Sequence, residues 1–276
     1  MQNMKKTIFG TMLFSCLLFT SCDVFELDNY EEPKETIIGE VVDSKTGERI
    51  LTDQGSEGIR VRMTELSWGD NVEHNPDFYC KSDGSFQNTK IFKGTYNIRI
   101  DGPFVPIVRE DERGVPIAND TKTLDIEGTI NVKFEVQPFL KVEFVDYPTV
   151  SNGQITARVK VTRGISNDEF REKIEPMGNY NSSFTNVTDI QLFVSYSSSV
   201  GYRARDERWS NKIEYVGSEF ENLLGKEITI KSIKGQTIPS GKHVFVRAAA
   251  RINYDTPAGS GTRRWNYSEP MEVIIP

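Results

Sequence analysis

The chain has 276 residues, a length that suggests about two domains, each large enough to bury a core. Hydrophobic residues make up 37%, aromatic residues 11% and charged residues 26%, which indicates a globular protein and excludes a disordered chain. The net charge of −7 argues against a nucleic-acid partner, and two histidines and three cysteines exclude most metal sites and most histidine-dependent catalysis.

Residues 1–21 have the order of a bacterial export signal. Lys5 and Lys6 form a basic region, residues 8–19 are mostly apolar, and two small residues precede Cys22. The apolar run is short for a membrane span. We therefore expect this segment to be removed and to contribute nothing to the fold.

Residues 19–22, Phe-Thr-Ser-Cys, resemble the lipobox of bacterial lipoproteins. That resemblance implies cleavage before Cys22 and a diacylglycerol on its thiol. Together with the features below, it leads us to expect a lipid-anchored protein of the outer membrane, exposed on the cell surface. Residues 13–16 are a rival lipobox, but they leave a short apolar region after the lysines. The other alternative is a plain secretory signal with a chance cysteine.

Residues 22–35 are predicted to be an acidic tether. Residues 23–33 contain five acidic residues and no basic one, and the tether can extend to roughly 50 Å. Acidic residues after a lipidated cysteine resemble the surface-export signals of Bacteroides-type lipoproteins, and a plain soluble spacer is the alternative. Removal of Cys16 and acylation of Cys22 would leave Cys80 as a lone thiol, which we expect to be buried and unreactive.

Residues 36–137 are predicted to form a small β-sandwich. Short alternating or β-rich runs are separated by glycine-containing turns, and no run keeps a helical period. The predicted strands are residues 37–42, 59–63, 85–92, 95–100 and 129–136.

Four segments of this region resemble the carboxypeptidase-regulatory-like, transthyretin-like sandwich: residues 39–47, 58–61, 82–86 and 92–96. The resemblance implies that they are scaffold, with the Asp83-Gly84 turn entering one strand and Gly94 opening the next.

A calcium site is an alternative interpretation of Asp83 with Asp70, Asn71 and Asp77, because Ca²⁺ takes several oxygen ligands. The spacing matches no EF-hand and Asp-Gly is a common turn, so we assign no metal.

Residues 138–276 are predicted to form a second sandwich, separated from the first at Pro138. Asn167–Ile174 is predicted as one short helical turn. The end of the chain resembles the close of a fibronectin type III or immunoglobulin-like domain. The predicted strands are residues 139–145, 155–161, 190–196, 228–230, 243–252 and 271–275. The fold class expected for the chain is all-β, with two sandwiches in tandem that fold separately.

The whole arrangement resembles a Bacteroides two-domain surface-lipoprotein family classed as a domain of unknown function. The lipobox, the linker 28–33, residues 245–251 and residues 265–268 carry the resemblance. It implies a place beside importers similar to the starch-utilisation system and a role in glycan capture for uptake. It transfers no catalytic residue.

No nucleophile elbow, phosphate loop or His-x-x-His pair occurs in the sequence, so we expect no enzyme activity and no cofactor. Paired carboxylates leave a glycoside hydrolase as a remote alternative. A structural or interaction subunit of an outer-membrane importer complex, without glycan contact, is the other alternative.

Aromatic residues beside arginines are the candidate glycan contacts, because the C–H face of a sugar stacks on a flat ring. The candidate stacking residues are Tyr202, Trp209, Trp265 and Tyr267, with Arg263 and Arg264 as polar partners; the segment from Trp68 is a weaker candidate. Rings at strand ends also commonly close a hydrophobic core, so the alternative is that these side chains are structural.

Overall fold

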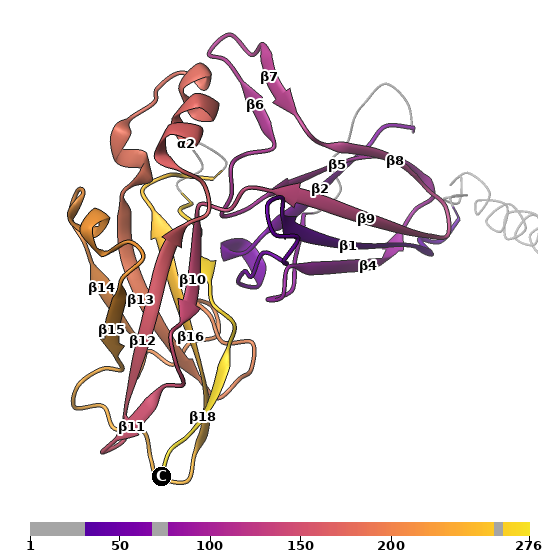
Figure 1. The fold of residues 1–276 in the computed structure, drawn as a ribbon. Coiled ribbons are helices and arrows are strands. Elements are labelled where there is room, and N and C mark those ends of the chain that lie inside the picture. The colour runs from indigo at the N-terminus through magenta and orange to yellow at the C-terminus, as the bar shows by residue number, and fades with distance from the viewer. Residues whose placement is uncertain (1–30, 68–76, 257–261) are drawn as a thin grey trace, which may run out of the picture. The chain divides into compact units, whose positions relative to one another are not determined.

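The computed structural model describes residues 31–67, 77–256 and 262–276, and strands dominate them (Figure 1). The chain divides into Met1–Pro33 and one compact unit, Lys34–Pro276. The all-β prediction is confirmed. Within the described residues no helix is long and apolar enough to cross a membrane. The predicted signal peptide, Cys22 and the candidates at Trp68, Asp70 and Asn71 lie outside the described residues.

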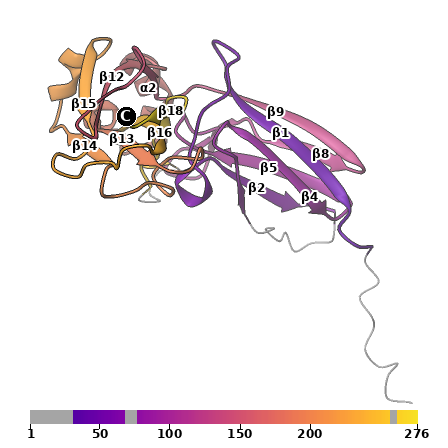
Figure 2. The same ribbon diagram turned by 90° about the horizontal axis from the view of Figure 1, so that it is seen from below.

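Residues 35–136 form two sheets, and Figure 2 labels six of their strands, β1, β2, β4, β5, β8 and β9. The first has the order β4-β1-β9, in which β1 pairs antiparallel with β4 and parallel with β9. The second has the order β3-β2-β5-β8, and β6 and β7 form a separate hairpin. The strands are β1 (Glu35–Asp43), β2 (Arg60–Glu65), β3 (Phe78–Tyr79), β4 (Ser85–Ile91), β5 (Gly94–Asp101), β6 (Val108–Glu110), β7 (Pro116–Asn119), β8 (Lys122–Ile126) and β9 (Thr129–Val136), with a 3-10 turn, η1 (Gly55–Glu57).

Alternation in these strands puts one face of each sheet into a shared hydrophobic core. Gly39 and Phe86 are opposite each other on β1 and β4, and a Cβ on Gly39 would lie 2.0 Å from the Phe86 ring. The glycine therefore leaves room for a ring that is 1% exposed. Gly84 has a φ of 77°, as a left-handed turn position requires. These residues are structural, as the resemblance implied.

Residues 140–274 also form two sheets, which face each other in Figure 1. One has the order β10-β12-β11, with β15 also paired to β12, and the other has the order β14-β13-β16-β17, with β18 also paired to β16. The strands are β10 (Leu140–Phe144), β11 (Thr149–Ser151), β12 (Gln154–Arg163), β13 (Val187–Ser195), β14 (Asn211–Glu214), β15 (Glu227–Lys231), β16 (His243–Ile252), β17 (Asn266–Tyr267) and β18 (Met271–Ile274). The 3-10 turns are η2 (Glu175–Met177), η3 (Ser182–Thr185) and η4 (Glu219–Leu223).

The predicted helical turn is confirmed as α2 (Asn167–Ile174). Ser166 caps it: the Ser166 hydroxyl accepts from the Glu169 amide at 3.2 Å, and the Glu169 carboxylate accepts from the Ser166 amide at 3.1 Å. Phe170 and Ile174 are buried on its inner face. Capping and two apolar anchors explain why a helix forms in this otherwise polar stretch.

Strands β13 and β16 are buried on both faces over most of their length. Their inner face joins the core between the two sheets. On the outer face, Phe193 and Ala249 join Val200, Trp265 and Tyr267 in a second cluster, which also receives Leu51 from the first half of the chain. Part of the outer sheet face is therefore an internal contact surface.

Candidate functional site

Trp209 is a core residue. Its side chain is 3% exposed, packs in the core of the C-terminal sandwich and contacts Tyr196 edge-to-face at 5.3 Å between ring centroids. The Arg208 guanidinium lies 4.6 Å from the Trp209 ring centroid. The expectation that Trp209 is exposed in a loop is wrong, because its ring is part of the hydrophobic core.

Tyr267 joins the two halves of the chain and is also buried, at 4% exposure, against the expectation. Its hydroxyl donates to the Asp53 carboxylate at 3.2 Å, and that carboxylate also accepts from the Arg203 amide at 3.0 Å. Burial, together with the charge of Asp53, raises the pKa of Tyr267. Gly201 has no side chain here because a Cβ would lie 2.7 Å from an Asp53 oxygen.

Arg247 reinforces this contact from within the protein, at 1% exposure. Its guanidinium donates to the carbonyls of Thr52 at 2.8 Å, Ser82 at 3.0 Å and Ser268 at 2.7 Å, and lies 4.5 Å from the Tyr267 ring centroid. Burial lowers its pKa from the ordinary arginine value. The group is an internal cross-link and is not available to a ligand.

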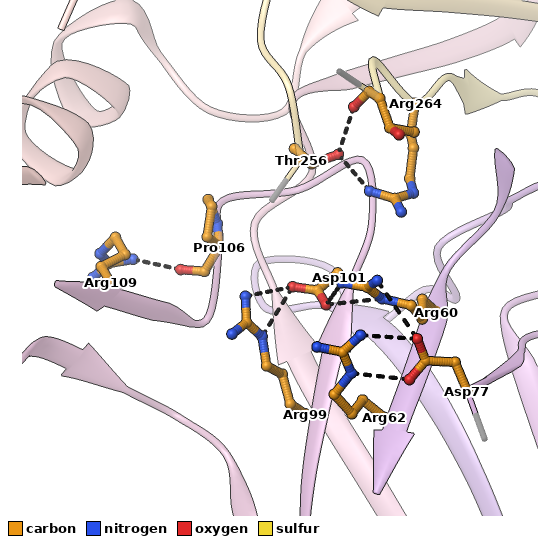
Figure 3. A network of polar contacts seen from close by, with 10 residues as sticks. Arg60, Arg62, Asp77, Arg99, Asp101, Pro106, Arg109, Thr256 and Arg264 are labelled. Atoms are coloured by element: carbon orange, nitrogen blue, oxygen red, sulfur yellow. Dashed lines mark hydrogen bonds and ion pairs between the residues drawn. The ribbon is translucent and has the colours of Figure 1, made fainter. Parts of the chain in front are cut away.

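Arg264 is buried at 5% exposure, so the prediction of an accessible polar partner is wrong for it. It donates to the Thr256 hydroxyl at 3.0 Å, and Figure 3 shows its guanidinium above the ion pairs of Arg60 and Asp101. Arg263 is 45% exposed and lies 3.5 Å from an Asp255 carboxylate oxygen. Of the two predicted arginines, only Arg263 reaches the surface.

Trp265 and Tyr202, both predicted, lie together in a stack. Their ring planes are 23° apart with centroids 4.7 Å apart, Arg205 lies 4.1 Å from the Tyr202 centroid, and Arg251 lies 4.2 Å from the Trp265 centroid. Tyr202 is half-buried, whereas Trp265 is 3% exposed. Trp265 therefore has no open face for a sugar, contrary to the expectation.

Asp189 holds the stack in place from β13. The buried carboxylate accepts from Arg251 at 2.6 Å, from Gln191 at 2.7 Å and from the Trp265 indole at 3.1 Å. Burial alone would raise the pKa of Asp189, but the Arg251 charge and these hydrogen bonds lower it overall. Asp189 is thus ionised at neutral pH and fixes the orientation of the three side chains it binds.

A cavity of about 440 Å³ opens beside this stack, and we name it the Tyr202 pocket. It has the size of a small-molecule site. It lies on the outer face of the β14-β13-β16-β17 sheet. Its lining consists of Gln191, Tyr202, Arg205, Glu207, Ser210, Asn211, Lys212, Ile233, Arg251 and Trp265.

Charged pairs frame the pocket. Arg205 donates to Glu207 at 2.7 Å, Lys212 to Glu214 at 2.6 Å, and Arg251 to Asp189. The amides of Gln191 and Asn211 and the Ser210 hydroxyl complete the polar wall. The arrangement offers donors and acceptors in one hollow, which suits a neutral polyhydroxyl ligand.

A family model and a solved structure identify the same family. Residues 35–137 match the family described as Protein of unknown function (DUF3823) N-terminal domain. A crystal structure of a DUF3823 family protein from Bacteroides uniformis is 70% identical to this chain, covers 88% of it and 100% of the other chain, and superposes with a TM-score of 0.86. The chain belongs to the DUF3823 family.

Two more distant structures share the fold of this DUF3823 protein. One, from Bacteroides uniformis and described as a candidate carbohydrate binding protein, is 19% identical with a TM-score of 0.62, and the other, a DUF3823 family protein from Parabacteroides merdae, is 14% identical with a TM-score of 0.58. Each covers 88% of this chain and 100% of its own. A search of the curated proteins finds no match.

The remaining candidates of the DUF3823 chain have structural partners. Cys80 is 2% exposed, and burial raises its pKa far above the ordinary thiol value, which agrees with an unreactive thiol. Asp83 accepts from the Ser85 amide at 3.0 Å, and Asp77 accepts two hydrogen bonds from Arg62 at 2.9 and 3.0 Å. Both carboxylates from the calcium interpretation thus already have protein donors.

Gln191, Arg205, Asn211 and Lys212 of the pocket were not among the predicted contact residues. Arg205 lies between the predicted candidates Tyr202 and Trp209, so its position between two predicted rings was the available signal. The other three lie on strands β13 and β14, where polar side chains at alternate positions are also expected of an ordinary solvent face.

Proposed function

We propose that this DUF3823 protein is a non-catalytic glycan-binding protein, anchored by lipid to the outer-membrane surface, and that it serves a polysaccharide uptake system. The observation that carries the proposal is the Tyr202 pocket, where amide, guanidinium, ammonium and carboxylate groups surround one hollow beside a ring stack. The lipobox at Cys22 supports the location.

The pocket binds sugar mainly through polar groups. Arg205 lies over Tyr202, so the stack presents a planar guanidinium to the cavity and its N–H groups can donate to hydroxyls. Glu207 is 78% exposed and can accept. The amide groups of Gln191 and Asn211 each donate one hydrogen within the protein, to Asp189 and to the Lys231 carbonyl, and each keeps a second hydrogen to donate. Adjacent hydroxyls of a pyranose match this mixture better than an apolar ligand does.

The fold of one relative also supports a carbohydrate-binding function. A structure described as a candidate carbohydrate binding protein has the same fold along its whole length.

A matched pair of arginines tests the proposal. Arg205 and Arg208 are in one loop, each over an aromatic ring and each paired with a neighbouring carboxylate, but only Arg205 lines the pocket. Residues 34–276, the compact unit, are screened on a glycan array, and the best ligand is titrated by calorimetry. We expect Arg205→Ala to weaken binding at least tenfold and Arg208→Ala to change it less than twofold.

An array with no bound glycan, or equal losses in both variants, contradicts the proposal. Either result favours the alternative of a structural subunit in an importer complex.

A further inference from the structure

A second cavity, of about 470 Å³, lies on a different part of the C-terminal sandwich, and we name it the Tyr254 pocket. Its lining includes Met177 at the end of η2, Asn179 two residues later, Phe184 in η3, and Tyr254, Asp255 and Arg263 after β16. It shares no lining residue with the Tyr202 pocket.

One wall of the pocket is aromatic and rigid. The Tyr254 ring packs against Phe184 at 5.4 Å, Phe170 at 5.3 Å and Phe139 at 5.8 Å between centroids. Met177 and Phe184 are only partly buried and face the cavity from the side. An apolar surface fixed in this way fits the C–H face of a sugar ring.

Two buried polar atoms of the pocket-lining residues Tyr254 and Asp255 have no hydrogen-bond partner among the described residues. The Tyr254 hydroxyl belongs to a side chain that is 4% exposed, and it has no hydrogen-bond partner among the described residues; the same holds for the buried Oδ1 of Asp255. Arg263 Nε forms an ion pair with that oxygen at 3.5 Å, a distance too long for a good hydrogen bond. Buried polar groups normally pair, so two neighbouring exceptions that line one cavity indicate groups that a ligand completes.

Arg109 has a third such atom, and its charge acts on Tyr254, although Arg109 does not line the cavity. Its buried Nε has no partner among the described residues, although its Nη1 donates to the Pro106 carbonyl at 3.0 Å (Figure 3). Burial raises the pKa of Tyr254 to about 12, partly offset by the Arg109 charge, so the hydroxyl keeps its proton at neutral pH and can donate. The site therefore holds donors and one carboxylate acceptor together.

This combination selects a neutral hydroxylated ligand. A sugar hydroxyl can donate to Asp255 and accept from Tyr254 or Arg263, whereas a carboxylate or phosphate has no hydrogen to donate to the Asp255 carboxylate. We propose that the Tyr254 pocket is a second carbohydrate site that binds one neutral pyranose residue, with the sugar face on Met177 and Phe184 and its hydroxyls on Asp255. The ligand class in this inference rests on the proposed glycan-binding function, but the residues that support it are not those of the Tyr202 pocket.

Neutral and acidic monosaccharides test the ligand class. Methyl glucoside, methyl galactoside, methyl mannoside and methyl glucuronide are titrated into residues 34–276 with NMR detection. At least one neutral glycoside is expected to bind in the millimolar range, and the glucuronide at least tenfold more weakly. A crystal soaked with the binding glycoside should place it against Asp255. Binding by none of the neutral glycosides, or tighter binding of the glucuronide, overturns the proposal.

Variants test the assigned groups. Asp255→Ala should weaken binding at least tenfold, and Tyr254→Phe about fivefold with the melting temperature within 2 °C of the parent, because the hydroxyl loses no protein partner. Tyr180→Phe is the control: Tyr180 contacts Phe184 at 6.1 Å but does not line the cavity. A large fall in melting temperature for Tyr254→Phe, or unchanged binding in the first two variants, refutes the assignment.

The Arg205→Ala variant separates the two sites. If it abolishes binding of every sugar while Asp255→Ala has no effect, the Tyr254 pocket is not a site and the Tyr202 pocket remains one. If Asp255→Ala alone abolishes binding, the Tyr254 pocket stands and the proposed role of the Tyr202 pocket fails.

Discussion

Replacing Trp265 with alanine should destabilise the protein strongly. The indole is 3% exposed, stacks on Tyr202 and donates to Asp189. A buried aromatic side chain removes about 150 to 250 Å² from water, and at about 25 cal/mol per Å² this corresponds to about 4 to 6 kcal/mol. Measured losses for such truncations are about 3 to 5 kcal/mol, so we expect about 4 kcal/mol.

Trp265→Phe separates packing from hydrogen bonding. It keeps most of the ring but removes the indole N–H, while Asp189 retains its bonds from Arg251, Gln191 and Thr188. We expect a loss of about 1 to 2 kcal/mol. Urea unfolding followed by circular dichroism measures both variants, and thermal melts should show a fall of about 8 to 16 °C for Trp265→Ala.

The reasoning fails if Trp265→Ala melts within 2 °C of the parent protein. That result would mean that the indole is exposed in solution, and it would restore Trp265 as a candidate for sugar stacking.

Two further predictions concern the anchor and acid stability. Cys22→Ser should abolish incorporation of labelled palmitate and release the protein from the membrane fraction, whereas Cys16→Ser should do neither. If only the Cys16 variant lost the label, the predicted cleavage site before Cys22 would be wrong and cleavage would occur before Cys16. Asp189→Asn should have a lower free energy of unfolding than the parent protein at pH 7. This difference in stability should become smaller as the pH falls below about 4. The folded pKa of Asp189 is below its unfolded value, so its stabilisation is present above the unfolded pKa and is lost as the pH falls through the folded one. Urea midpoints at several pH values measure this, and a gap that stays constant would contradict it.

The strand pattern predicted the fold well where one sheet face meets a core. The alternating run at 129–136 is β9, the run at 243–252 is β16, and the helical turn at 167–174 is α2. Short strands such as β6, β7 and β8 were not predicted. Their residues are mostly exposed, so no apolar alternation marks them.

The candidate site was harder to predict than the fold. Period-2 alternation identifies which side chains share a face, but not which distant segment covers that face. On β16, Arg247 and Arg251 both point outward, yet Arg247 is sealed by the carbonyls of Thr52 and Ser82, while Arg251 reaches a pocket. The burial of Tyr267 and Arg264 depends on such long-range contacts, which no local pattern contains.

The parallel pairing of β1 with β9 has a mechanical consequence. Eight residue pairs join the two strands, from Thr36 with Thr129 to Asp43 with Val136. The chain enters β1 at its first residue and leaves β9 at its last, so a pull between the predicted N-terminal tether and the C-terminal sandwich would act on opposite ends of the ladder. The hydrogen bonds are then loaded in shear and must break together, whereas a hairpin pulled from one end unzips bond by bond. A protein tethered at its N-terminal end would in this way resist the drag of a long polymer held by its C-terminal sandwich.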